Sequence, residues 1–274
     1  WRVYENTGSG FASDPTRWDL PFPLEDESAP AGRFHGVLDL SADGLIDLVV
    51  YQDDLLVDGD PLLGRAYWRV YENTGSGFAS DPTRWSLPIP LEDRSNAASD
   101  AHALVDLDAD GALDMVVFDD ELLPDGDPLV GRAYWRLYRN TGSGFAMDAD
   151  RWSLPYPLEI NGRGTFGDGT FGLLDLAADG AVDLVYYDDE RLPDGDPLAG
   201  RAYWRVHANT GSGFAEEGAQ WRLPFPLEGN ARGPATRHHG VWAGPDQCPA
   251  LFFYSDEELP DGDPLIGRAY WVYH

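Results

Sequence analysis

The alternation of apolar and polar positions in this chain is typical of short β-strands. In residues 102–158 the segments AHALVDL and ALDMVVFDD are mostly apolar, as expected of strands buried on both faces. GRAYWRLYRN alternates and is rich in aromatic residues, and the turn NTGSGF separates it from a last strand in RWSLPYPLE. No segment of this unit has a helical period. The pattern therefore predicts four strands and no helix.

This pattern recurs along the whole chain. Gly-Arg-Ala-Tyr precedes Trp68, Trp135, Trp204 and Trp271, at spacings of 67, 69 and 67 residues, and residues 1–18 recur letter for letter at 68–85. Four strands per unit and four units predict an all-β fold, a four-bladed β-propeller forming a single domain over residues 1–274. The units are 35–91, 102–158, 171–227 and a composite of 238–274 with 1–24, in which N- and C-terminal strands pair and close the ring.

The composite unit is expected to have inner strands near 239–242 and 250–254 and an outer strand at 18–24. Two segments compete for its third strand, residues 1–6 and residues 270–274, because the two ends of the chain overlap in the repeat. Two alternatives stay open: the chain is a fragment of a larger ring, or its ends pair between molecules.

Pairs of prolines two residues apart mark the last strand of every unit. Residues i and i+2 direct their backbone N–H groups to the same side, so two missing donors are tolerated only at an edge without a neighbour. We therefore predict that this strand is outermost, with the prolines inside it blocking association with other molecules. The pairs are Pro21 and Pro23, Pro88 and Pro90, Pro155 and Pro157, and Pro224 and Pro226.

Charge limits the class of partner. The net charge is −29 and all 19 basic residues are arginine, so the surface repels nucleic acid and anionic lipid. No apolar run approaches the roughly 20 residues of a membrane-spanning helix. One cysteine, Cys248, excludes an intrachain disulfide framework. The excess acid has two explanations, which are compatible with each other: cation sites in the repeats and a salt-adapted surface.

The most specific chemical motif is DLDADGALD, residues 106–114. Alternate side chains in a tight loop converge on one point, Gly111 permits the turn, and Asp114 returns from the next strand. Hard oxygen ligands at this spacing suit calcium, and magnesium fits less well because it prefers a stiffer shell with several waters. Capping of β-turns by the aspartates is the alternative interpretation.

The motif predicts about three calcium sites, with the second strongest and the third weakest. At the position of Asp108, the first loop has serine and the third has alanine. The fourth unit retains only Asp246, so no ion is expected in that unit. The predicted ligands are Asp39, Ser41, Asp43, Leu45 and Asp47; Asp106, Asp108, Asp110, Ala112 and Asp114; and Asp175, Asp179, Ala181 and Asp183, with Ala112 acting through its carbonyl.

The DxDxDGxxD loops together with the W-R-V-Y-x-N-T-G-S-G-F segment resemble the FG-GAP or VCBS-type repeats of integrin α-chain propellers and of bacterial secreted proteins. The resemblance covers essentially the whole chain, although the full Phe-Gly…Gly-Ala-Pro signature is absent. It implies that the loop carboxylates bind calcium and that the ring serves adhesion or ligand display.

Three further sets of residues recur. The PDGDP loops predict tight turns whose aspartates face a following arginine, with a second set of ion sites as the alternative. The histidines at the start of the innermost strands are either ordinary strand ends or a cluster at a central channel. Trp68, Trp135 and Trp204 are expected in the core, whereas Trp242 is unique to its unit. The loop and histidine residues are Asp58, Asp60, Asp125, Asp127, Asp194, Asp196, Asp261, Asp263, His35, His102 and His238.

No nucleophile elbow, phosphate-binding glycine loop or zinc motif is present, so we predict no enzymatic activity. The expected function is a calcium-binding β-propeller, mainly stabilised by its ions, that acts as a secreted or cell-surface binding or adhesion module. Such sites fill in extracellular calcium. The ligand is an unknown protein or glycan, and the ring is expected to be monomeric. The alternatives are a lectin-like carbohydrate binder and a structural segment of a larger toxin or surface protein.

Overall fold

The structure is a computed structural model of the 274-residue chain. It describes residues 1–8, 10–22, 35–51, 66–91, 102–118, 132–157, 171–187, 198, 201–226, 239–243, 249–253 and 272–273. All regular elements in these ranges are β-strands. Across the same ranges no helix is long and apolar enough to cross a membrane.

Three units each form a four-stranded antiparallel sheet in which strands adjacent in sequence are adjacent in space. The prediction of four antiparallel strands per unit is confirmed for these three. The strands are β3 (His35–Leu38), β4 (Asp47–Val50), β5 (Tyr67–Tyr71) and β6 (Thr83–Ser86); β7 (His102–Val105), β8 (Asp114–Val117), β9 (Tyr134–Tyr138) and β10 (Asp150–Ser153); and β11 (Phe171–Leu174), β12 (Asp183–Tyr186), β13 (Tyr203–His207) and β14 (Ala219–Arg222).

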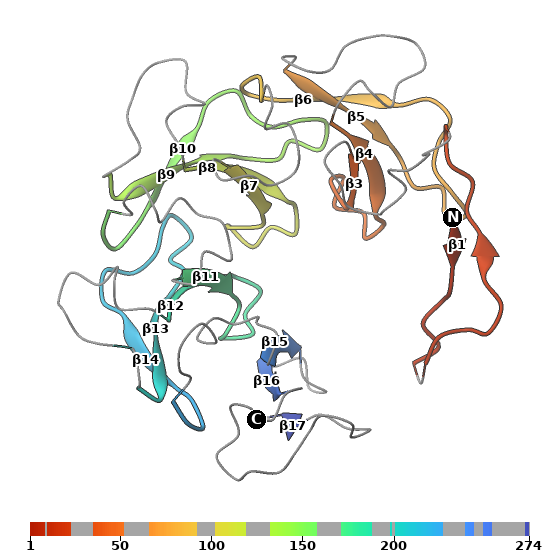
Figure 1. The fold of residues 1–274 in the computed structure, drawn as a ribbon. Helices are drawn as coiled ribbons and strands as arrows, with labels where there is room; N and C mark the ends of the chain where they lie inside the picture. The colour runs from red at the N-terminus through yellow and green to blue at the C-terminus, as the bar shows by residue number, and fades with distance from the viewer. Residues whose placement is uncertain are drawn as a thin grey trace.

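The sheets follow one another along an arc (Figure 1). In each of the three complete sheets the first strand lies nearest the middle of the arc and the last lies at the outside. Burial follows this order: every residue of β4, β8 and β12 is buried, whereas most residues of β6 and β10 and all of β14 are exposed. The apolar runs are therefore the central strands, because both faces of a central strand are covered by neighbouring sheets.

The two ends of the chain form smaller sheets. β1 (Arg2–Val3) pairs only with β2 (Thr16–Arg17), while β15 (His239–Ala243), β16 (Pro249–Phe253) and β17 (Val272–Tyr273) form a three-stranded sheet. The two predicted inner strands of the composite unit are confirmed, and β17 takes the third position. The predicted outer strand at 18–24 is wrong in its bounds, since β2 ends at Arg17. No ladder between the described residues joins β1 or β2 to the C-terminal sheet.

The last strand of each complete sheet is outermost, as the prolines predict, but the prolines do not lie inside it. β6 ends at Ser86, two residues before Pro88, and β10 and β14 end at the equivalent positions before Pro155 and Pro224. Proline has no N–H to donate, so the ladder stops before the first of the pair. The expectation that the prolines protect this edge from within the strand is therefore corrected: they end it.

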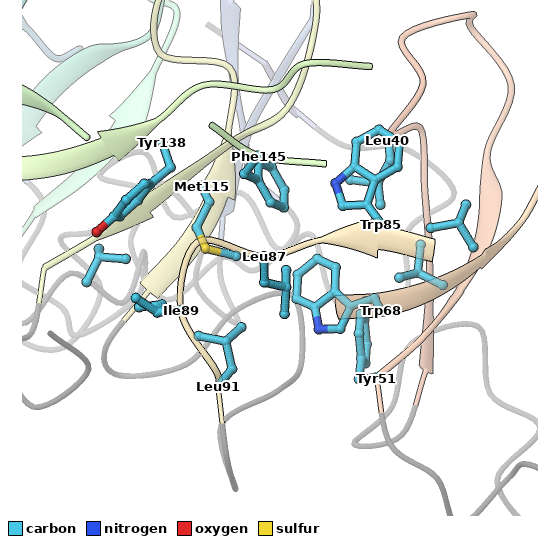
Figure 2. Close-up of a cluster of buried hydrophobic side chains, with 13 residues drawn as sticks. Leu40, Tyr51, Trp68, Trp85, Leu87, Ile89, Leu91, Met115, Tyr138 and Phe145 are labelled. Atoms are coloured by element: carbon cyan, nitrogen blue, oxygen red, sulfur yellow. The ribbon is translucent and has the colours of Figure 1, made fainter. Parts of the chain in front are cut away.

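Successive sheets are held together by a phenylalanine that packs against two tryptophans. Trp68 of β5 lies opposite Trp85 of β6, and the ring of Phe145, from the turn of the next unit, lies 6.1 Å from each, edge-on (Figure 2). Phe214 packs in the same way against Trp135 and Trp152. The predicted core roles of Trp68, Trp135 and Trp204 are confirmed, since all three are buried.

The backbone of the same turn also docks on the preceding unit. Gly144 bridges to Ser86, and the N–H of Phe145 donates to the carbonyl of Ser86 at 2.9 Å. A Cβ at Gly144 would lie 2.8 Å from the backbone nitrogen of Ser86, and φ there is 156°. Glycine is required because the two backbones touch.

Candidate metal-binding loops

The three aspartate loops connect β3 to β4, β7 to β8 and β11 to β12, and they share one backbone conformation. Ala42, Ala109 and Ala178 have φ of 57°, 60° and 55°, each followed two residues later by a glycine at 85°, 90° or 89°. A left-handed alanine costs roughly 1 kcal/mol or more relative to its usual conformation. The same strained turn thus recurs at the same position in all three loops.

The aspartates at the first and fifth positions of each loop hold this turn together. In the second loop, Asp106 accepts the N–H groups of Asp110 and Gly111 at 3.1 and 2.9 Å, and Asp110 accepts the N–H of Ala112 at 2.8 Å. The first and third loops repeat these bonds through Asp39 and Asp43 and through Asp175 and Asp179. These bonds are the ones that the turn-capping interpretation predicts.

The last aspartate of each loop is different, because it is buried at the start of the second strand. One oxygen of Asp114 accepts the backbone N–H of Asn140 at 2.8 Å, while Oδ2 is buried without a hydrogen-bond partner. Asp47 has the same arrangement with Asn73 at 2.9 Å. Turn capping does not account for these oxygens, since a buried carboxylate oxygen without a donor is costly.

The second loop also brings three carboxylates together. Oxygens of Asp106, Asp108 and Asp110 all lie within 4.8 Å of one another, the one such group of three found among the described residues. Oδ1 of Asp108 is buried without a hydrogen-bond partner, while its Oδ2 pairs with Arg139. Arg139 also pairs with Asp150 at 2.8 Å. Ser41 and Ala177 take the place of Asp108 in the other two loops.

These groups fit a hard divalent cation. The available ligand atoms are all oxygens, and three carboxylates lie close together in the second loop. One buried oxygen of Asp108 and one of Asp114 accept no hydrogen bond, so both are available to a cation. Burial raises the pKa of Asp114 to about 6, with further increases from the charges of Asp110 and Asp106, against a decrease from the Asn140 N–H bond. Burial likewise raises the pKa of Asp47 and Asp183. A bound cation would favour the charged form of these buried carboxylates and so oppose the increase.

Lowering the pH from 7 to 5 is expected to stabilise the ion-free protein. Asp114 has a pKa of about 6 in the folded state and 3.8 ordinarily, so between these values the folded chain binds a proton that the unfolded chain does not. Stability therefore rises as pH falls through 6, by about 1 kcal/mol at pH 5. Thermal melting in chelator at the two pH values measures this, and Asp114→Asn should show a smaller rise. An equal rise in the variant would contradict the assignment.

The remaining sequence candidates divide into two groups. His35 and His102 begin β3 and β7 and are buried, and Phe171 takes the equivalent position in β11. The carbonyls of Leu45, Ala112 and Ala181 remain predicted ligands; the backbone N–H groups of these residues donate to Asp43, Asp110 and Asp179, respectively. The three PDGDP loops, the equivalent VDGDP loop of the first unit, His238, Asp246 and the side chain of Trp242 lie outside the described residues.

Sequence reasoning missed two partners of the loops. Asn140 donates from its side chain to the carbonyl of Leu40 in the preceding unit at 2.9 Å, and Asn209 does the same to Leu107 at 2.8 Å. The first and second aspartate loops are therefore each tied to the turn of the next unit. The recurrence of the asparagine in NTGSGF was the available signal. Arg139 carried no such signal, since the equivalent residue of the first unit is Glu72.

No protein-family model matches this sequence, and no curated protein sequence matches it. Solved structures do resemble it. The Tc holotoxin pore of Photorhabdus luminescens has a TM-score of 0.53 at 16% identity, over 94% of this chain and 10% of that chain. An Agrocybe aegerita lectin that recognises non-reducing terminal N-acetylglucosamine has a TM-score of 0.47 at 18% identity, over 93% of this chain and 55% of that chain. At 16% identity the likeness to the Tc holotoxin pore concerns the fold alone, and this chain corresponds to a small part of that chain.

Proposed function

We propose that this protein is a calcium-stabilised β-propeller module, of the FG-GAP or VCBS type, that binds a partner and does not catalyse a reaction. The observation that carries the proposal is the buried Oδ2 of Asp114, which has no hydrogen-bond partner and follows a loop where three carboxylates converge. A calcium ion would supply the missing positive charge. Asp106, Asp108, Asp110 and Asp114 would hold it, together with the carbonyl of Ala112.

The role of the ion is mainly structural. It would neutralise a loop that connects the two inner strands of a unit and that also accepts the asparagine of the next unit. Binding of an ion to the folded state alone stabilises that state by mass action. The first and third loops would bind more weakly, because Ser41 is neutral and Ala177 offers no side-chain oxygen.

The proposal includes closure of the arc into a four-unit ring, in which β15 and β16 are the inner strands of the last blade and β1 and β2 its outer strands. A closed ring is a rigid platform, and its repeated loops would present a multivalent rim to a protein or glycan partner. Calcium loops of this kind fill outside the cell, which supports a secreted or surface-displayed protein.

The arginine at the second loop provides an internal competitor for the ion. Arg139 pairs with Asp108, so calcium must displace or share that contact. Replacing Arg139 by glutamine should therefore strengthen calcium binding at this loop, whereas a loop neutralised by arginine alone would gain nothing from calcium.

Calorimetric titration with calcium and with magnesium, combined with thermal melting in calcium and in chelator, tests the proposal. We expect about three calcium sites and a melting temperature higher in calcium by about 5 °C or more, since saturation at 100 times Kd contributes roughly 2.7 kcal/mol per site. Magnesium should give a smaller effect. Absence of calcium heat together with an unchanged melting temperature would refute the calcium role.

A further inference from the structure

Two exposed aromatic side chains belong to a repeated set that is otherwise buried. Phe11 is 76% exposed, whereas its counterparts Phe78, Phe145 and Phe214 are 8%, 3% and 4% exposed. Trp221 is 42% exposed, whereas its counterparts Trp85 and Trp152 are 3% and 1% exposed. Phe11 and Trp221 therefore occupy core positions of the repeat but lack the neighbouring side chains that bury their counterparts.

The contacts in the other units identify the side chains that bury these positions. Phe78 packs against Trp1 and Trp18 of the N-terminal sheet, at 5.8 and 5.6 Å. Phe145 packs against the tryptophan pair of the first complete unit, and Phe214 against that of the second. The pair that remains is Trp204 and Trp221 of the third unit, and the phenylalanine that remains is Phe11.

The turn that carries Phe11 already has the docked conformation. Gly10 has φ of 157°, as Gly77 has, and the N–H of Thr7 donates to the carbonyl of Gly10 at 2.8 Å, as Thr74 does to Gly77 at 2.9 Å. A Cβ at Gly77 would lie 2.9 Å from the carbonyl oxygen of Asp19, but one at Gly10 meets no described atom within 4 Å. The turn therefore already has the docked conformation, but no described strand lies against it at Gly10.

The receiving strand is β14. In the other units the glycine of the turn bridges to Asp19, Ser86 or Ser153, each of which directly follows a tryptophan. The equivalent residue after Trp221 is Arg222, at the end of β14. The inner part of this face is already covered, because Leu251 and Val241 of the C-terminal sheet pack in one cluster with Trp204. The outer part, at Trp221, is the part left exposed.

We propose that the turn carrying Asn6, Gly10 and Phe11 docks on β14 of the same chain. Phe11 then packs against Trp204 and Trp221, and Gly10 lies against Arg222. The side chain of Asn6 then donates to the carbonyl of Leu176, as Asn140 does to Leu40. The occupant is the chain's own turn because the C-terminal sheet already covers the adjoining face, and a tethered segment has a high effective concentration. This inference rests on the ring proposed above and names the contact that closes it.

If the turn docks in this way, β1 and β17 compete for the same position beside β16. β17 pairs with β16 through Val272 and Phe253, in the register that β13 uses on β12. Counting from the repeated tryptophan, Arg2 of β1 is the counterpart of Val272. Among the described strands, β1 is paired with β2, which would supply a fourth strand to this sheet. The docked turn therefore requires β1 to take the place of β17 on β16.

Cross-linking in solution tests the proposal. In a Cys248→Ser background, the pair Phe11→Cys and Trp221→Cys is treated with a short bismaleimide and analysed by mass spectrometry and size exclusion. We expect an internal cross-link in more than half of the molecules, all of them monomers. Phe11→Cys with Met147→Cys, at an exposed site of another unit, is the matched control and should not cross-link. Cross-linked dimers whose yield rises with concentration would assign the face to a second copy and overturn the proposal.

A second readout covers loss of the cross-link through misfolding. Phe11→Ala should lower the melting temperature by about 5 °C or more, comparably to Phe78→Ala, and should add little to Trp221→Ala. Unchanged melting with Phe11→Ala, or full additivity with Trp221→Ala, would also overturn it. Calcium titration of the same variants separates the proposals: retained calcium binding without coupling between Phe11 and Trp221 removes only the docking.

Discussion

Asp114→Asn is expected to change stability in opposite directions with and without calcium. Burial raises the pKa of Asp114 to about 6, so the charged carboxylate is unfavourable at neutral pH. Without the ion, the substitution removes this charge, and the melting temperature should rise by several degrees. With calcium, the variant lacks a ligand, so its affinity at this loop should fall about 100-fold and its melting temperature should drop below that of the wild type. Melting curves in chelator and in excess calcium measure both effects.

The reversal is the diagnostic result, because a purely structural role for Asp114 gives the same sign in both conditions. The exposed Asp81 offers a matched control, since Asp81→Asn removes the same charge outside the loops and should change neither curve. The variant retains an oxygen that can accept the Asn140 N–H bond, so the connection between loop and turn is preserved. If Asp114→Asn destabilises the protein equally in chelator and in calcium, the ion does not bind at this loop.

Phe145→Ala is expected to be among the most destabilising single substitutions. Its ring packs edge-on against both Trp68 and Trp85 of the preceding unit, within a buried cluster that also includes Met115 and Leu87 (Figure 2). Removing a buried phenylalanine ring costs about 3–5 kcal/mol, which corresponds to about 10 °C in melting temperature for a domain of this size.

Met147, two residues later in the same turn, is the matched control. It is 66% exposed, so Met147→Ala removes a large apolar side chain without leaving a cavity. The expected change is within about 0.5 kcal/mol. Similar melting temperatures for Phe145→Ala and Met147→Ala would show that the units are not held together by the phenylalanine and its tryptophan pair.

Much of the local structure could be predicted from the repeat. Four strands per unit, their antiparallel order and the burial of Trp68, Trp135 and Trp204 followed from runs of apolar residues and from strict recurrence. Recurrence is informative because each unit must bury the same face against its neighbour. The aspartate spacing also predicted that Asp106, Asp108 and Asp110 would lie together, because a tight loop leaves little choice.

Contacts between units, and contacts of residues that do not recur, could not be predicted in this way. The pairing of Asn140 with Leu40 of the preceding unit spans 100 residues. The contact of Arg139 with Asp108 lies within one unit but depends on an arginine that the other units lack. The prolines correctly indicated which strand is outermost, but they lie after this strand and not within it. Proline within an edge strand and proline just past the end of a strand give the same sequence pattern.

The sequence by itself determined which segments are strands, which of them are central and where acidic side chains gather, because these depend on neighbours a few residues away. The tertiary structure alone decided that Oδ2 of Asp114 is buried without a partner, that Phe145 packs against two tryptophans of another unit, and that Phe11 and Trp221 are exposed. The physical reason is that burial is a property of the assembled sheets: identical residues 1–18 and 68–85 have different surroundings because different sheets lie beside them.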